Sequence, residues 1–252
     1  MTKLIDLTQP WCAQTPTWPY FPSSEVTAFH SHHRDNVHSL IIKTNMHSGT
    51  HVDAPLHFNP RGWDCAEVPL ERLVGTGLVV DLSDVVEPYT LVSRKMVEDR
   101  LPEELRKDDI LILHLGWKKY SWVGEEEDEV MYFDKHPGPD ESLTDWLVER
   151  NVKWAGCDAP AFEHPFNTAI RDYRPDLVAE FEQKYGPIEK IAPRKNMLHC
   201  HRRMMARNLM HVDNLGGDID KVVNRRVNVG AFPWKFIRGE ASICRVIVFD
   251  GD

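Results

Sequence analysis

The segment from residue 47 to residue 57 constrains the fold of this chain more than any other. It contains four potential metal ligands, all at odd-numbered positions: His47, His51, Asp53 and His57. Because an extended backbone repeats every two residues, one side of an extended segment would carry all four side chains. Gly49 and Pro55 disfavour a helix here. The spacing therefore predicts an extended segment that directs imidazole and carboxylate groups toward one point.

Imidazole nitrogens and carboxylate oxygens together suit Zn²⁺, Mn²⁺ or Fe²⁺, and the spacing does not select one of these ions. Histidines also occupy ordinary structural positions, so a pair of them at this spacing carries little information by itself. Four potential ligands on one side of one segment, with a glycine that allows close approach, favour metal binding instead. We therefore predict that residues 47–57 form part of a metal site.

The same segment resembles the HxGTHxDxPxH signature of the cyclase family of metal-dependent hydrolases, and every fixed position of that signature is present. The resemblance implies that His47, His51 and Asp53 bind a divalent metal, Zn²⁺ or Mn²⁺ before others, and that His57 is a catalytic acid or base. It also implies an α/β fold of the swivelling β/β/α type, with mixed sheets flanked by helices. We expect one such domain over residues 1–252.

A second part of the metal site is expected between residues 201 and 213. His201 falls near the start of a predicted helix, Asn208 interrupts the pattern, and a short predicted strand ends at Asp213. A helix, a turn and a returning strand can bring the two side chains together at a sheet edge. The resemblance places His201 and Asp213 where the family has a metal-binding histidine and a metal-binding glutamate. Aspartate is one methylene shorter and can reach one ion without bridging two, so one and two ions per chain both remain open.

The resemblance extends in order along most of the chain. It includes short matches at residues 5–8, 115–117, 156–160, 232–235 and 239–242. Residues 120–136 and 163–194 show no correspondence to the family pattern, and we expect these regions to shape the pocket. The resemblance therefore does not identify the substrate of this chain with that of any one family member.

The implied ligand set predicts hydrolysis. A divalent ion lowers the pKa of a bound water from about 15.7 toward about 7, so that the water can attack a carbonyl carbon at neutral pH. His57 would then move a proton to the leaving group. We expect cleavage of a carbon–nitrogen bond in a small amide, formamide or lactam. Two alternatives stay open: hydrolysis of a lactone or ester at the same site, and a non-catalytic small-molecule-binding protein on the same fold.

Four further residues are candidates for substrate binding: Trp18, Tyr20, His164 and His211. The two aromatic residues belong to a cluster near the N-terminus that can wall an apolar pocket or form a subunit contact. His211 would share its side of a strand with Asp213. His164 lies in a predicted loop, which is equally consistent with a structural role. The resemblance implies a homodimer or a homotetramer.

The pattern of short β-branched runs and amphipathic stretches predicts strands and helices intermixed along the chain. Strands are predicted at residues 4–7, 37–45, 77–82, 109–114, 153–157, 210–213, 227–232 and 241–249. Helices are predicted at residues 93–100, 143–150, 176–184 and 196–207. Ser93 is suited to cap the first helix. This alternation by itself predicts an α/β protein.

Charge and composition exclude several partners. A formal net charge of -9 disfavours nucleic acid and anionic membranes, and no apolar run approaches the roughly 20 residues needed to span a bilayer. The N-terminal residues lack the apolar stretch of a signal peptide. Five cysteines without a CxxC pair predict reduced thiols. We therefore expect a cytoplasmic enzyme with a small-molecule substrate.

Overall fold

A closed, mixed sheet forms the centre of the structure, a computed structural model that describes residues 2–251. Seven strands follow one another around the closed sheet: β4 (His51–Asp53), β10 (Met210–Asp213), β9 (Trp154–Cys157), β7 (Ile110–His114), β5 (Val74–Asp81), β11 (Arg225–Pro233) and β12 (Ala241–Asp250). Strands β5, β7, β9 and β10 are parallel, and the remaining pairings are antiparallel. The predicted α/β class with mixed sheets is confirmed.

The ring closes because β12 is long enough to pair with two different strands along one edge. Its first residues, 241–243, pair with β4, and residues 247–250 pair with β1 (Lys3–Asp6). Its other edge pairs with β11 over residues 244–249. The short strand β4 is thereby held between β10 and β12, so both of its edges are hydrogen-bonded.

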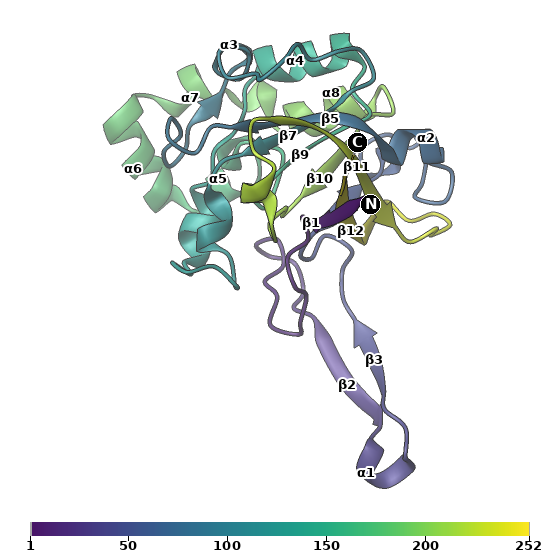
Figure 1. Cartoon of the computed structure of the whole chain (residues 1–252). Coiled ribbons are helices and arrows are strands. Elements are labelled where there is room, and N and C mark those ends of the chain that lie inside the picture. The colour runs from purple at the N-terminus through teal and green to yellow at the C-terminus, as the bar shows by residue number, and fades with distance from the viewer. Residues whose placement is uncertain (1, 252) are drawn as a thin grey trace.

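The alternation of side chains along the central strands separates two cores. Strand β7 is buried throughout: Ile110 and Ile112 pack with the residues inside the closed sheet, whereas Leu111 and Leu113 pack outward. The outward core includes residues of α4 (Glu141–Arg150) and α8 (His199–Met205), which cover the sheet together with α3 (Arg94–Glu98) (Figure 1). A strand buried on both faces reads as a continuous apolar run, as β7 does.

The remaining helices have four residues each except α6, which has 11, and three of the five lie together. They are α1 (His32–Asp35), α2 (Leu70–Leu73), α5 (Ile170–Tyr173), α6 (Pro175–Tyr185) and α7 (Ile188–Ile191). Helices α5, α6 and α7 lie beside one another at one side of the sheet (Figure 1). They enclose a small core of their own, to which Phe166, Leu177 and Phe181 contribute. Two-residue strands β6 (Leu91–Val92) and β8 (Gly138–Pro139) pair separately. Within residues 2–251, no helix is both long and apolar enough to cross a membrane.

Most predicted elements are present, and two need correction. Ser93 caps α3 by accepting a hydrogen bond from the backbone N–H of Met96. The helix predicted at 196–207 is shorter, because Leu198 has a left-handed φ of 54° and α8 begins only after it. The strand predicted at 37–45 is β3 (Ser39–Lys43), which does not join the closed sheet. It pairs with β2 (Glu25–His30) in a separate hairpin.

Candidate metal centre and active site

Strand pairing brings the two halves of the predicted metal site together. In the antiparallel pair β4–β10, His51 lies opposite Asp213, and Asp53 lies opposite His211. Asp53 also pairs with Ala241 on the other edge of β4. Residues 162 and 158 positions apart in the sequence thus face each other across one ladder. The helix–turn–strand pattern does bring His201 and Asp213 to one cavity, with Asn208 in the left-handed turn at φ 56°. The predicted sheet edge is wrong, because β10 pairs with β9 on one side and β4 on the other.

The segment 47–57 is not extended throughout, and this part of the prediction is wrong. Only His51–Asp53 forms a strand, because Gly49 turns the chain with a φ of +63°. Pro55 then begins a 3₁₀ turn, Pro55–His57, with its φ suited to the first helical position. The two turns still direct His47 and His57 to the same side, and their ring centroids are 4.4 Å apart.

Three imidazoles surround the carboxylate of Asp53. Its Oδ1 lies 2.8 Å from Nδ1 of His47 and 3.3 Å from Nε2 of His51, and its Oδ2 lies 3.6 Å from Nε2 of His201. Asp213 stands behind His51, with Oδ2 3.9 Å from the Nε2 of that histidine. All five side chains that the sequence and the family resemblance assign to the metal therefore converge on one point.

The donor set fits a divalent cation. Three groupings of ligand atoms are close enough to hold one: His47, Asp53 and His57; His51, Asp53 and Asp213; and Asp53, His201 and His211. Asp53 belongs to every grouping. Oδ1 of Asp213 and Nδ1 of His211 are buried without a hydrogen-bond partner within the described residues. Buried carboxylates require compensation, and within residues 2–251 no lysine or arginine forms an ion pair with Asp53 or Asp213.

The shifted pKa values of these groups indicate that a positive charge beside Asp53 is stabilised. Burial and the neighbouring charge of Asp53 raise the pKa of Asp213 to about 7. Burial by itself would lower the pKa of His47, but the Asp53 carboxylate outweighs it and raises the value to about 10. His57 has no such contact, and burial lowers its pKa to about 4. A proton or a cation is thus held strongly around Asp53.

Glu163 is a site residue that the sequence analysis missed. It is fully buried, and its Oε2 accepts hydrogen bonds from the backbone N–H of Cys200 at 2.9 Å and from Nδ1 of His201 at 3.1 Å. These contacts place His201 at the start of α8 and direct its Nε2 to Asp53. A signal was present: Glu163 is the only acidic residue between residues 159 and 170. Glu240, 3.6 Å from Nε2 of His47, was also missed as a site residue.

A cavity of about 230 Å³ opens onto the cluster. His47, His51, Asp53, His57, His201 and Asp213 form its floor. Its walls are mostly apolar and come from separate regions of the chain: Trp18, Phe21, Phe58, Phe133 and Leu198, with prolines and alanines between them. Within the described residues, no lysine or arginine lines it. The candidate metal centre therefore lies in a largely apolar cavity, to which Thr168 and Asn214 add two uncharged polar side chains.

Of the residues predicted to bind substrate, some line the cavity and others lie outside it. Trp18 lines the cavity. Tyr20 is 57% exposed outside it and stacks on Tyr173 at 3.9 Å between ring centroids. His211 is fully buried behind the floor, with Nε2 3.2 Å from Sδ of Met204. That position makes it a candidate ligand instead of a wall residue.

His164 lies outside the cavity and is bonded on both sides. Its Nε2 donates to the carbonyl of Tyr89 at 2.9 Å, and its Nδ1 accepts from the backbone N–H of Phe166 at 3.2 Å. Burial lowers the pKa of His164 to about 4, so the imidazole is neutral. The structure gives His164 a structural contact where the sequence suggested a pocket residue.

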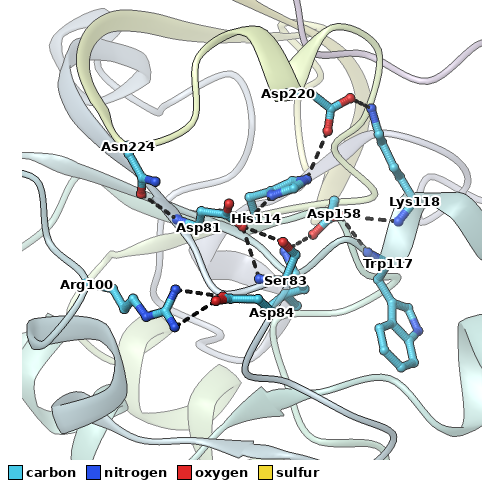
Figure 2. Close-up of polar contacts among 11 residues, drawn as sticks. Asp81, Ser83, Asp84, Arg100, His114, Trp117, Lys118, Asp158, Asp220 and Asn224 are labelled. Atoms are coloured by element: carbon cyan, nitrogen blue, oxygen red, sulfur yellow. Dashed lines mark hydrogen bonds and ion pairs between the residues drawn. The ribbon is translucent and has the colours of Figure 1, made fainter.

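A second polar cluster lies at the carboxyl ends of the parallel strands, apart from the cavity (Figure 2). His114 ends β7 between two carboxylates, with Nδ1 2.9 Å from Asp81 and Nε2 3.1 Å from Asp220. Asp158, just after β9, accepts backbone hydrogen bonds from Leu115 and Trp117. These contacts join the loops at this edge, and they explain the Asp158 turn as a structural feature.

Comparison with solved structures shows that the fold of this chain is a known one. An isatin hydrolase bound to the product analogue thioisatinate superimposes with a TM-score of 0.78 at 18% identity, covering 100% of this chain and 93% of the other. Isatin hydrolase A from Labrenzia aggregata, bound to benzyl benzoate, gives 0.75 at 18% identity, covering 100% and 94%. These solved structures share the fold of this chain, in which the buried His/Asp cluster forms a candidate metal centre.

The sequence comparisons identify the family. The family model described as "Putative cyclase" matches residues 5–164, and the chain belongs to this cyclase family. Kynurenine formamidase from Erythrobacter litoralis (strain HTCC2594) is 25% identical over 213 residues, which cover 84% of this chain and 76% of that enzyme. Kynurenine formamidase from Bacillus thuringiensis (strain Al Hakam) is 29% identical over 163 residues, covering 64% and 71%.

Proposed function

We propose that this enzyme hydrolyses the carbon–nitrogen bond of a small, neutral amide, formamide or lactam at a centre of one or two Zn²⁺ or Mn²⁺ ions. The observation that carries the proposal is the convergence of the buried His/Asp cluster around Asp53 at the floor of an apolar cavity. The names of the relatives, formamidases and isatin hydrolases, support an amide as the bond that is cleaved.

A metal would be held by His47, His51, Asp53, His201 and Asp213, with His211 within reach of the same carboxylate. When bound, such an ion supplies an activated water and polarises the scissile carbonyl group. His57 lines the cavity beside His47 and, kept neutral by burial, is free to accept a proton from the nucleophile and to return it to the leaving nitrogen.

The wall of the cavity favours an uncharged substrate. Trp18, Phe58 and Phe133 offer flat apolar surfaces, and the lining contains no guanidinium or ammonium group that could pair with a substrate carboxylate. An anionic or zwitterionic substrate would lose hydration without a compensating contact from the wall. A neutral aromatic amide would lose little hydration free energy on entering the cavity.

The experiment is a substrate panel on protein reconstituted with Zn²⁺ or Mn²⁺. It compares an N-formylarylamine, the same compound with an added carboxylate, a lactam fused to an aromatic ring, and the ester and lactone analogues. We expect turnover of the neutral amides, and a kcat/KM at least about tenfold lower for the carboxylated analogue. Turnover of only the ester and the lactone would contradict the proposed amidase activity and indicate an esterase. Stoichiometric metal binding without turnover of any compound would favour a non-catalytic binding protein.

A further inference from the structure

Leu198 has a backbone conformation that is unusual for its residue type. It directly precedes α8 with a φ of 54° and a ψ of 38°, in the left-handed region. There the Cβ atom of an L-residue comes close to a carbonyl oxygen, and only glycine, asparagine and aspartate adopt the region routinely. Within residues 2–251, six of the ten non-glycine residues with a positive φ are asparagine or aspartate, and Leu198 is the only one with a purely aliphatic side chain. A contact of the side chain is needed to explain a leucine at this position.

Capping of α8 does not explain the leucine. The residue before a helix is usually Ser, Thr, Asp or Asn, because its side chain accepts a hydrogen bond from one of the first backbone N–H groups. Leu198 makes no such bond. Glu163, in the loop after β9, accepts from the backbone N–H of Cys200 at 2.9 Å and from that of His201 at 3.3 Å. A distant carboxylate thus caps α8, and position 198 is free to carry an apolar side chain.

Packing in a hydrophobic core does not explain the leucine either. Leu198 belongs to none of the three cores of the described residues, and it is not among the half-buried side chains that pack against them. Cys200 and Met204, in α8, do pack in the core between the sheet and the helices. Leu198 instead lines the cavity that opens onto the candidate metal centre. The side chain at the strained position therefore faces the space where a substrate would bind.

The candidate ligands aside, Leu198 is the largest side chain that residues after Phe133 add to the cavity wall. The others are small or uncharged: Pro160, Ala161, Thr168, Ala169 and Asn214. The backbone N–H of Leu198 donates to the carbonyl of Asn167 at 2.6 Å, which joins it to the lining residues that follow Asn167. The candidate ligand His201 lies three residues after Leu198, in the first turn of α8. Leu198 therefore occupies the part of the wall next to the candidate metal centre.

We infer that Leu198 is a specificity-determining residue that limits the bulk a substrate can carry on the carbonyl carbon of its scissile bond. This role rests on the proposed function, amide hydrolysis, in which that carbonyl group lies at the candidate metal centre. A side chain next to the centre contacts the substituent on the carbonyl carbon, whereas the far end of an aromatic ring extends toward the aromatic part of the wall. One methylene group in an apolar pocket typically changes kcat/KM by about 10–200-fold, so the isobutyl side chain of Leu198 is large enough to discriminate between acyl groups.

The test is the acyl selectivity of protein reconstituted with Zn²⁺. It measures kcat/KM for formanilide, acetanilide and isobutyranilide, which differ only in the group on the carbonyl carbon, and for para-tert-butylformanilide, which carries its bulk at the far end of the ring. In Leu198→Ala we expect the ratio of isobutyranilide to formanilide to rise at least about tenfold, with the ratio of the two formanilides unchanged. Leu198→Phe should lower the ratio of acetanilide to formanilide. The exposed Leu70→Ala is the matched control and should change none of these ratios.

Thermal unfolding distinguishes a cavity role from a packing role without any turnover. If Leu198 faces the cavity, the unfolding temperature of Leu198→Ala should stay within about 2 °C of the wild type. Leu147→Ala makes the same change at a fully buried core side chain and should lower the unfolding temperature by about 4 °C or more, because it leaves a void in the core. Metal content is measured on every variant by elemental analysis. A Leu198→Ala protein as unstable as Leu147→Ala would make Leu198 a packing residue and overturn the inference.

The activity measurements have equally definite outcomes. An unchanged acyl selectivity in folded, metal-loaded Leu198→Ala would overturn the role of Leu198, and so would an equal gain for para-tert-butylformanilide. A wild type that hydrolyses none of the anilides would contradict the proposed amidase function, and calorimetric titration with the same anilides would then test Leu198 separately. Tighter binding of isobutyranilide by Leu198→Ala than by the wild type would support the contact with the ligand. Unchanged or absent binding would overturn it.

Discussion

Nδ1 of His201 donates a hydrogen bond to Oε2 of Glu163 over 3.1 Å, and both side chains are buried. In the neutral imidazole, this contact places the proton on Nδ1 and leaves the lone pair of Nε2 on the side of Asp53. A carboxylate behind a ligating histidine sets the orientation and the basicity of that histidine. Glu163 is therefore a positioning residue of the candidate metal centre.

Replacing Glu163 by glutamine should weaken metal binding. The amide keeps the size of the side chain but removes the charge that holds His201, and loss of such a partner typically costs about 10–100-fold in metal affinity. The measurement is competition for Zn²⁺ against a chromophoric chelator. Glu180→Gln makes the same change in an exposed ion pair with Lys135 and should leave the affinity unaltered. An unchanged affinity in Glu163→Gln would contradict the positioning role.

Asp53→Asn should remove more metal than Asp213→Asn. Asp53 contributes to all three groupings of ligand atoms, whereas Asp213 contributes to one. We expect elemental analysis of dialysed protein to find little metal in Asp53→Asn and a partial loss in Asp213→Asn. The exposed Asp84→Asn serves as the control. If Asp213→Asn lost as much metal as Asp53→Asn, the central position of Asp53 would be wrong.

His57→Ala should separate catalysis from metal binding. If His57 transfers protons, the variant keeps its metal content while kcat falls by about 10²–10⁴-fold. Elemental analysis and turnover of the best amide substrate are measured on the same preparation, with the exposed His38→Ala for comparison. Loss of metal together with activity would instead make His57 a ligand in the grouping with His47 and Asp53.

Buried neutral histidines should make the fold sensitive to mild acid. Burial lowers the pKa of His164 to about 4 and that of His136 to about 3, against about 6.5 in an unfolded chain. Below pH 6.5 the unfolded chain therefore binds more protons at these positions than the folded one. The free energy of unfolding should fall between about pH 6.5 and pH 4, by on the order of 1 kcal/mol per pH unit for each histidine.

Urea unfolding in the presence of a chelator, at pH 7.5 and at pH 5, measures this effect. His164→Gln should lose less stability than the wild type between the two pH values, because one of the buried neutral histidines is absent. The exposed His33→Gln should retain the full wild-type dependence. A His164→Gln variant with the same pH dependence as the wild type would show that another group controls acid stability.

Local patterns in the sequence predict most of the strands and helices correctly. The β-branched runs at residues 77–82, 109–114 and 241–249 correspond to β5, β7 and β12, and Ser93 caps α3 as its position predicts. The segment 47–57 was recognised because its ligands are close in sequence. Its backbone was predicted wrongly, since a glycine in the left-handed region and a 3₁₀ turn reach the same point by another path.

Long-range contacts were outside the reach of such patterns. Glu163 and His201 are 38 positions apart, and their hydrogen bond depends on how the loop after β9 meets the start of α8. Strand β3 was predicted as an apolar strand, but whether it joins the closed sheet or stands apart depends on which strand it pairs with. The same apolar alternation is compatible with either.

The amino-acid sequence by itself therefore determined the α/β class, the order of the main strands and helices, and the candidate ligands of residues 47–57, because these depend on local periodicity and on side-chain chemistry. His201 and Asp213 were added to the candidates by the family resemblance. Only the tertiary structure decided that the sheet closes through β12, that Asp53 is the common member of the three ligand groupings, and that Glu163 orients His201. The physical reason is that a buried charge is tolerated only where distant segments supply its partners, and those segments meet only in the folded chain.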